Sequence, residues 1–377
     1  MKRKLTALFL VLSLMFSGCS TWMDGEYHSV KPHEGRSPQK ADGVITVDGY
    51  QGLRLALENM VNSGKETQTL YVQGMSHTVV PANILMAIQY VKEKTPIGAY
   101  AVEEITYEVG TSGEVSAVAI KVQYTHDLAQ LRRIKYVNGE AAAATLVINA
   151  LKQCETGIVL HVSEYIGTDY VQLVEDYARE NPDVVMELPQ VTANIYPEVG
   201  AERLVELEFK YQTSRESLKT MQSAVQQVFS AAAPYVSGAA DDAVKFAQMY
   251  SFLMERYHYK IETSITPAYS LLLHGVGDSR TFATVYAAMC RKAKLECYVV
   301  SGTRNGEPWF WNIISANGQC MHLDLLQSHQ SGGYRILTDA QMEGYVWDYS
   351  AYPACEFIPG ETTEATEATE TEIVPEE

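Results

Sequence analysis

A short glycine-containing segment, Gly275 to Ala283, holds the residues best suited to chemistry. It contains Ser279 and runs into the apolar stretch 285–290, which predicts a helix. The N-terminus of a helix stabilises negative charge. A serine there acts as a nucleophile only if a neighbouring base takes its proton, because the hydroxyl does not ionise near neutral pH. Asp278 and Arg280 flank Ser279, either as a ligand-binding pair or as a solvated helix cap.

Residues that could act on the Ser279 hydroxyl as a base, or orient such a base, lie further along the sequence. Trp309 carries only an N–H donor and cannot accept a proton. His322 and Asp324 are two positions apart on an expected strand, so we expect them on the same strand face. A Ser279–His322 pair is one alternative, and an ordinary strand histidine is the other. Cys290 lies inside the apolar helix pattern, which favours core packing over a displaced nucleophile.

These motifs, in this order, resemble the transglutaminase-like superfamily, of the papain-like cysteine-nucleophile class. In that family a glycine-rich turn delivers a Cys to a helix N-terminus, before an aromatic-Ala pair that Phe282-Ala283 match here. Ser279 stands at the Cys position and Trp309 at the His position of a His-x-Trp-Asn motif. Asp324 matches the family's catalytic Asp. The resemblance covers about residues 245–355 and includes the strand ending at Ser301-Gly302.

The resemblance implies a domain without two of the three side chains that the family's reaction needs. The family's reaction needs a thiolate with a lowered pKa beside an imidazolium that an Asp orients. Serine and tryptophan at those two positions supply neither group. The family also binds extended peptides in a cleft, and aromatic rings favour such binding. The expected binding residues are therefore Asp278, Arg280, Phe310, Trp311 and Asn312.

Two stretches before this domain share one order of expected elements when Val47-Asp48-Gly49 is aligned with Val137-Asn138-Gly139. Each predicts a helix, a strand, a second helix and a hairpin. The first set is expected at 53–61, 69–73, 82–92, 105–109 and 115–124, and the second at 141–151, 158–163, 170–179, 191–196 and 203–211. Both second helices should end before a proline, Pro96 and Pro182. We therefore expect two α/β modules of about 90 residues, serving as a scaffold or forming a ligand-binding cleft.

The composition of both ends of the chain predicts segments that do not belong to a folded domain. Residues 1–18 combine basic residues, an apolar run and a small pair before Cys19, a pattern typical of a lipoprotein signal peptide with Cys19 as the lipidated residue. A plain secretory signal is the alternative. Residues 19–43 are polar and predict a tether. The Thr/Glu tract at 359–377 predicts a disordered tail.

Composition and charge argue against several classes of function. The formal net charge of −17 argues against nucleic-acid binding. There is no Cys-x-x-Cys pair to indicate a zinc or redox motif, and we expect neither a metal nor a cofactor. The expected fold class is α+β: modules at 44–136 and 137–230, followed by a transglutaminase-like (papain-like) domain at 231–358.

Three functional hypotheses follow. The first is an inactive, lipid-anchored extracytoplasmic protein of a bacterium that binds peptide, protein or cell-wall material. The second is an active peptidase or acyl transferase that uses Ser279 with a non-standard base such as His322. The third is a purely structural surface component in which the modules mediate protein contacts.

Overall fold

The computed structural model describes residues 39–41, 44–236, 241–261 and 264–356. The expected signal peptide, Cys19, most of the tether and the tail lie outside these residues. Within the described ranges, no helix combines the length and the apolar character needed to cross a membrane. The described residues form two compact units: those up to Lys92 together with Glu103–Tyr124, and Glu93–Val102 together with those from Thr125 onward.

The first unit is built on a mixed sheet with the strand order β1-β2-β3-β5-β4. Its strands are β1 (Gln39–Ala41), β2 (Val44–Asp48), β3 (Thr67–Gln73), β4 (Val102–Ser112) and β5 (Val115–Tyr124), with helices α2 (Gly49–Asn62) and α3 (Val80–Lys94). Side chains alternate across each strand. Leu70, Val72 and Val118 are therefore buried, whereas Thr69 and Ala119 are exposed on the opposite face.

The second unit begins with a sheet of order β6-β7-β9-β8. Its elements are β6 (Lys135–Val137), α6 (Glu140–Lys152), β7 (Gly157–Val162), α7 (Tyr170–Glu180), β8 (Gln190–Tyr196) and β9 (Arg203–Lys210). Leu160 and Leu207 share a buried cluster with α6 and α7. The helices and strands expected in both stretches are thus confirmed, most with longer ends and two strands, β7 and β9, ending one residue earlier.

A short helix that the sequence analysis did not expect, α4 (Pro96–Ala101), also belongs to the second unit. The first long helix does end before Pro96, as expected. The chain then starts a new helix, because proline is favoured at the first helical position and the Thr95 side chain accepts a hydrogen bond from Gly98 N. Another short helix, α5 (Leu128–Leu131), precedes β6.

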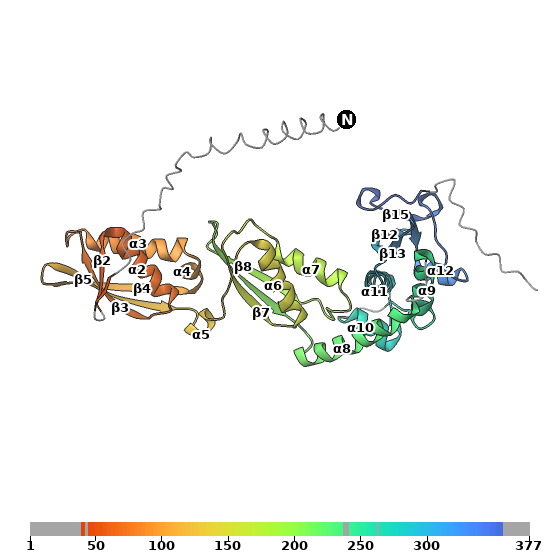
Figure 1. The fold of residues 1–377 in the computed structure, drawn as a ribbon, viewed down its shortest axis with the longest axis horizontal. Coiled ribbons are helices and arrows are strands. Elements are labelled where there is room, and N and C mark those ends of the chain that lie inside the picture. Colours follow the sequence, from red (N-terminus) through yellow and green to blue (C-terminus); the bar gives the residue numbers. More distant parts are fainter. Residues whose placement is uncertain (1–38, 42–43, 237–240, 262–263, 357–377) are drawn as a thin grey trace, which may run out of the picture. The chain divides into compact units, whose positions relative to one another are not determined.

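The C-terminal domain contains an antiparallel sheet of order β14-β13-β12-β15. Figure 1 labels three of its strands, β12, β13 and β15. The strands are β12 (Glu296–Arg304), β13 (Glu307–Ala316), β14 (Gln319–Leu323) and β15 (Tyr345–Trp347), and a parallel pair is formed by β10 (His258–Tyr259) and β11 (Val276–Gly277). The helices are α8 (Arg215–Ala232), α9 (Asp242–Met254), α10 (Pro267–His274), α11 (Ser279–Lys292) and α12 (Leu325–Gln330), with 3-10 turns η1 (Ala233–Tyr235), η2 (Asp339–Gln341) and η3 (Tyr349–Ala351). The boundary expected at 230 falls inside α8, whose Phe229 packs in the same core as Phe246 of α9.

This sheet carries a separate apolar cluster on each face. Ile314 lies in the cluster that contains α11, whereas Trp311, Ile313 and Trp347 form the cluster on the other side. Gly302 in β12 allows the second cluster to close, since a Cβ there would lie 2.2 Å from the backbone oxygen of Val346. Consecutive residues of β13 therefore point into different environments.

Candidate functional site

Two glycines shape the turn that leads to Ser279. Gly275 ends α10 with a φ of 80°, a left-handed conformation that favours glycine. A Cβ on Gly277 would lie 3.2 Å from Leu271 Cδ1. Asp278 then caps α11: its Oδ1 accepts hydrogen bonds from the Thr281 backbone N at 2.8 Å and from its hydroxyl at 2.7 Å. Asp278 thus serves as the helix cap, the second of the two roles considered for it.

Ser279 is the first residue of α11 and is 7% exposed. Its hydroxyl has no hydrogen-bond partner within the described part of the chain. The space beside it measures about 140 Å³ in all and has no room for a water-sized sphere. Ligand pockets in proteins usually enclose about 300–1,000 Å³. The serine therefore sits at the helix N-terminus without a base and without a substrate-sized cavity.

The carboxylate of Asp324 is fully occupied. Its Oδ2 accepts hydrogen bonds from Trp309 Nε1 at 2.6 Å and from the Tyr345 hydroxyl at 2.7 Å. Its Oδ1 accepts the backbone N–H groups of Leu326 and Gln327, at 3.1 and 3.0 Å, and so caps α12. Four donors use the lone pairs that a carboxylate offers. The residues at positions 309 and 324 are thus brought together, but as a donor and a saturated acceptor.

Aromatic and cationic groups surround this contact. The Arg304 guanidinium lies 5.4 Å from the Trp309 ring centre and 5.7 Å from that of Tyr345, and it hydrogen-bonds Gln327. The ring of Tyr259 lies 5.7 Å from that of Trp309. Burial, and then the nearby Asp324 carboxylate, raise the pKa of Tyr345, so its hydroxyl stays a donor. Sequence reasoning missed Arg304 and Tyr345, because nothing in their spacing signals that they meet Asp324.

The side chains expected to form an aromatic surface, at positions 310 to 312, lie on opposite faces of the sheet because side chains alternate along β13. Phe310 lies near α11, where the Arg280 guanidinium is 5.4 Å from its ring centre. Asn312 is fully buried and its Nδ2 donates to the backbone oxygens of Ala283 and Tyr298. Trp311 is 1% exposed and packs in the cluster on the opposite face. Trp311 and Asn312 are therefore buried residues, and although both border the small space beside Ser279, they form no open groove there.

His322 is not placed to serve Ser279. It is fully buried, and its Nδ1 accepts a hydrogen bond from Trp311 Nε1 at 2.9 Å. Its proton is therefore on Nε2, which donates to Asp339 Oδ1 at 2.7 Å. Burial lowers the pKa of His322, an effect that the bond to Asp339 opposes. The strand ends at Leu323, so Asp324 does not share the strand face of His322 as expected. The alternative Ser279–His322 pair thus lacks its geometric basis.

His322, Asp339 and Cys355 bring three metal-binding residue types within 4.8 Å of one another. The imidazole has no free lone pair, because one nitrogen accepts the indole N–H and the other carries the proton. Burial raises the pKa of Cys355 to about 12, so its thiol stays protonated near neutral pH. As bonded here, these residues form a structural network and offer no ligand set for a metal.

Cys290 is fully buried in the core beside α9. Burial raises its pKa well above the usual thiol value, and this agrees with core packing over a displaced nucleophile. The described cysteines, 154, 290, 297, 320 and 355, are all free thiols.

The C-terminal domain is a transglutaminase-like domain: residues 230–354 match the model of the Transglutaminase-like superfamily. Among solved structures, the chain is similar to a TGase, with 9% identity, a TM-score of 0.26, and coverage of 55% of this chain and 60% of that one. A proposed cysteine protease from Cytophaga hutchinsonii has 11% identity and a TM-score of 0.25, with 42% and 70% covered. A proposed protease from Parabacteroides distasonis has 7% identity and a TM-score of 0.23, with 68% and 39% covered. No curated protein is detectably similar in sequence.

Proposed function

We propose that this chain is a lipid-anchored bacterial surface protein whose transglutaminase-like domain is catalytically inactive and binds peptide or cell-wall material. The observation that carries the proposal is the hydrogen bond from Trp309 Nε1 to Asp324. An indole N–H occupies the acceptor that would have to orient a catalytic imidazole. Ser279, which stands where the family has its nucleophile, is left without a base. The localisation and the anchor rest on residues 1–19 alone.

Binding, in this proposal, takes place on the rim around the closed site. Tyr259 is 40% exposed beside Trp309, and Ile261 is 78% exposed two positions later. The Arg280–Phe310 pair flanks Ser279 with a cation over an aromatic ring. Exposed aromatic and basic groups of this kind anchor peptides well. Extended peptide segments are therefore the favoured ligands of this rim.

The two α/β stretches are, in the same proposal, copies of one module that hold the C-terminal domain away from the membrane. Their sheets have corresponding strand orders, with β2-β3-β5-β4 in one and β6-β7-β9-β8 in the other. In each of these orders the first two strands run parallel to each other, and the second and third strands pair antiparallel. The shared order of elements supports the duplication that the sequence alignment predicts.

Mass spectrometry of a peptide and cell-wall-fragment panel tests the inactive state. We expect no cleaved or cross-linked product from the wild type, from Ser279→Ala, or from the partial restoration Ser279→Cys. The combination of Ser279→Cys with Trp309→His restores both missing groups and frees Asp324 to orient an imidazole, so any activity should arise only there. Product from the wild type that disappears in Ser279→Ala would overturn the proposal and establish a serine-dependent enzyme.

A further inference from the structure

The two α/β sheets differ on the face opposite their helices. The proposed alignment matches Leu70 with Leu160, and the observed strand registers then match Ala119 with Glu206 and Lys121 with Glu208. All four of these β5 and β9 residues point away from the buried faces, because side chains alternate along a strand. At these two matched positions the first sheet therefore has an alanine and a lysine, whereas the second sheet has two glutamates.

In the second unit this face is closed by α4. The Tyr100 hydroxyl donates to Glu206 Oε1 at 3.3 Å, and Asn194 Nδ2 donates to Glu206 Oε2 at 3.3 Å. The Tyr100 ring stacks on His126 at 3.9 Å between ring centres and lies 5.6 Å from Tyr196. Glu206 thus anchors the helix that covers this face.

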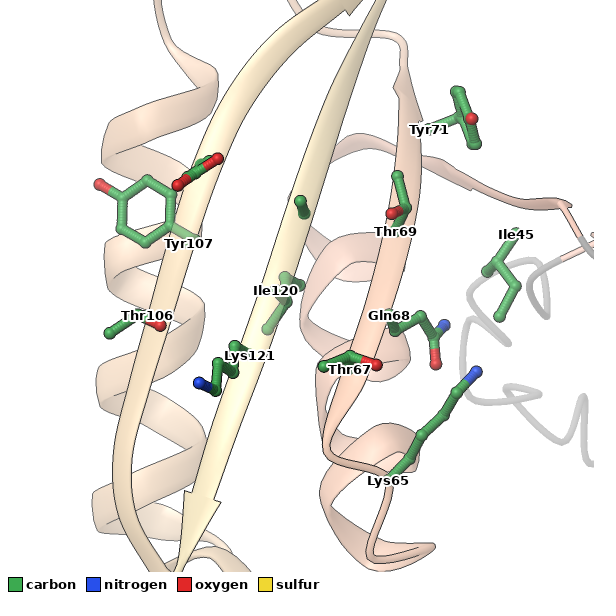
Figure 2. A pocket seen from close by; sticks show the side chains of 12 residues that line it. Ile45, Lys65, Thr67, Gln68, Thr69, Tyr71, Thr106, Tyr107, Ile120 and Lys121 are labelled. Carbon is green, nitrogen blue, oxygen red and sulfur yellow. The ribbon is translucent and has the colours of Figure 1, made fainter.

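In the first unit the equivalent face is hollow. A cavity of about 660 Å³ lies over β3, β5 and β4, and it includes the position of Ala119, where the other sheet has Glu206. Figure 2 shows Thr67, Thr69 and Tyr71 along β3, with Lys121 on the neighbouring strand. The volume is within the range of about 300–1,000 Å³ that is usual for ligand sites. The first sheet thus has an alanine and a hollow where the second has the glutamate that holds α4.

The charge of this hollow differs from that of the chain. Lys65 and Lys121 line it together with one acid, Glu108, whereas the whole chain has a net charge of −17. Across the described part of the chain, neither lysine makes a salt bridge or a side-chain hydrogen bond through its ammonium group. Both ammonium groups are therefore available to an anion.

Over the two inner strands of the hollow, β3 and β5, the backbone is not free for strand addition, whereas β4 is the edge strand of the sheet. β3 is paired with β2 and β5, and β5 is paired with β3 and β4, so the main-chain groups of these strands are already used. Recognition over these strands must come from side chains: the hydroxyls of Thr67, Thr69 and Thr106, the Tyr71 ring and the Lys121 ammonium group. Hydroxyl groups match a polyhydroxylated ligand, and an aromatic ring packs on its apolar face.

We propose that the hollow of the first unit binds an anionic saccharide, with Lys121 on its acidic group and the threonines of β3 on its hydroxyls. The acidic group can be a carboxylate or a phosphate. This inference concerns the first unit and does not depend on the function proposed for the transglutaminase-like domain.

Calorimetric titration of the full chain with trigalacturonate, with maltotriose phosphate and with neutral maltotriose tests the proposal. We expect at least one anionic trisaccharide to bind, and the two charged probes identify the acidic group. Lys121→Glu should weaken that binding by about tenfold or more, the size of a lost charge-assisted hydrogen bond. Ala119→Glu should weaken it by filling the hollow. Lys135→Glu, the same charge reversal at an exposed site on β6, should leave the affinity unchanged.

Three results would overturn the proposal. The first is no binding of either anionic trisaccharide by the folded wild-type chain. The second is wild-type affinity in both Lys121→Glu and Ala119→Glu, whose exposed positions leave the fold intact. The third is equal affinity for neutral maltotriose, which would remove the role of Lys121.

Discussion

Two hydrogen-bond networks of the C-terminal domain divide the parts of a catalytic triad between them. On the α11 side, Ser279 is positioned at a helix N-terminus but has no base, and Asp324 is saturated by other donors. On the opposite side of the sheet, His322 and Asp339 are hydrogen-bonded like a catalytic His–Asp pair, but His322 is fully buried. The comparison teaches that a set of residue types has catalytic meaning only when one accessible site contains all of it.

The largest effect should come from breaking the buried network. His322→Ala leaves the Trp311 indole N–H without a partner, removes a partner of Asp339 and opens a cavity. We expect a loss of about 3–4 kcal/mol in the free energy of unfolding, measured by urea denaturation. A loss below about 1 kcal/mol would mean that the network is not formed in solution. His329→Ala, at an exposed position, is the matched control.

Removing the hydrogen bonds of Asp324 should lower the free energy of unfolding by somewhat less. Asp324→Ala removes the cap of α12 and leaves Trp309 and Tyr345 without their acceptor. We expect a loss of about 2–3 kcal/mol by the same measurement. Asp348→Ala, which caps only an exposed 3-10 turn, should have a much smaller effect. Equal losses from the two variants would argue against a structural role for Asp324.

A pH titration of stability sharpens the contrast between the networks. The pKa of His322 is lower in the folded protein than its ordinary value of 6.5. The unfolded chain therefore binds the proton more readily, and stability is complete above that value and falls as the pH drops below it. The contribution of one such group is at most about 1.4 kcal/mol per pH unit. Urea denaturation from pH 7.5 to 5 measures it. A His322→Gln variant with an unchanged slope would assign the dependence to other groups.

The smallest effect should come from Ser279 itself. Ser279→Ala removes a hydroxyl that has no hydrogen-bond partner among the described residues. We expect a change within about 0.5 kcal/mol in the free energy of unfolding. A loss as large as that of Asp324→Ala would reveal a structural role for the hydroxyl and would weaken the contrast between the two networks.

Local patterns were enough to predict much of the fold. Apolar periodicity located the main helices and strands, and prolines located the ends of α3 and α7. The order of motifs identified the transglutaminase-like domain. The duplication of the modules, the signal peptide and the lipid anchor remain predictions. The helix α4 was missed because proline, which ended one helix, also started the next.

The sequence by itself determined that a transglutaminase-like domain is present and predicted which side chains stand at the positions of the family's chemistry, because chain order carries the motifs. Only the tertiary structure decided what each side chain does. Trp311 and Asn312 became core residues because β13 alternates between two apolar clusters. His322 forms hydrogen bonds with Trp311 and Asp339. Asp324 accepts hydrogen bonds from Trp309 and Tyr345. These partners are too far apart in the sequence for a local pattern to predict them. Hydrogen-bond partners depend on separations of about 3 Å in space, and these are set only when the sheet and helices pack.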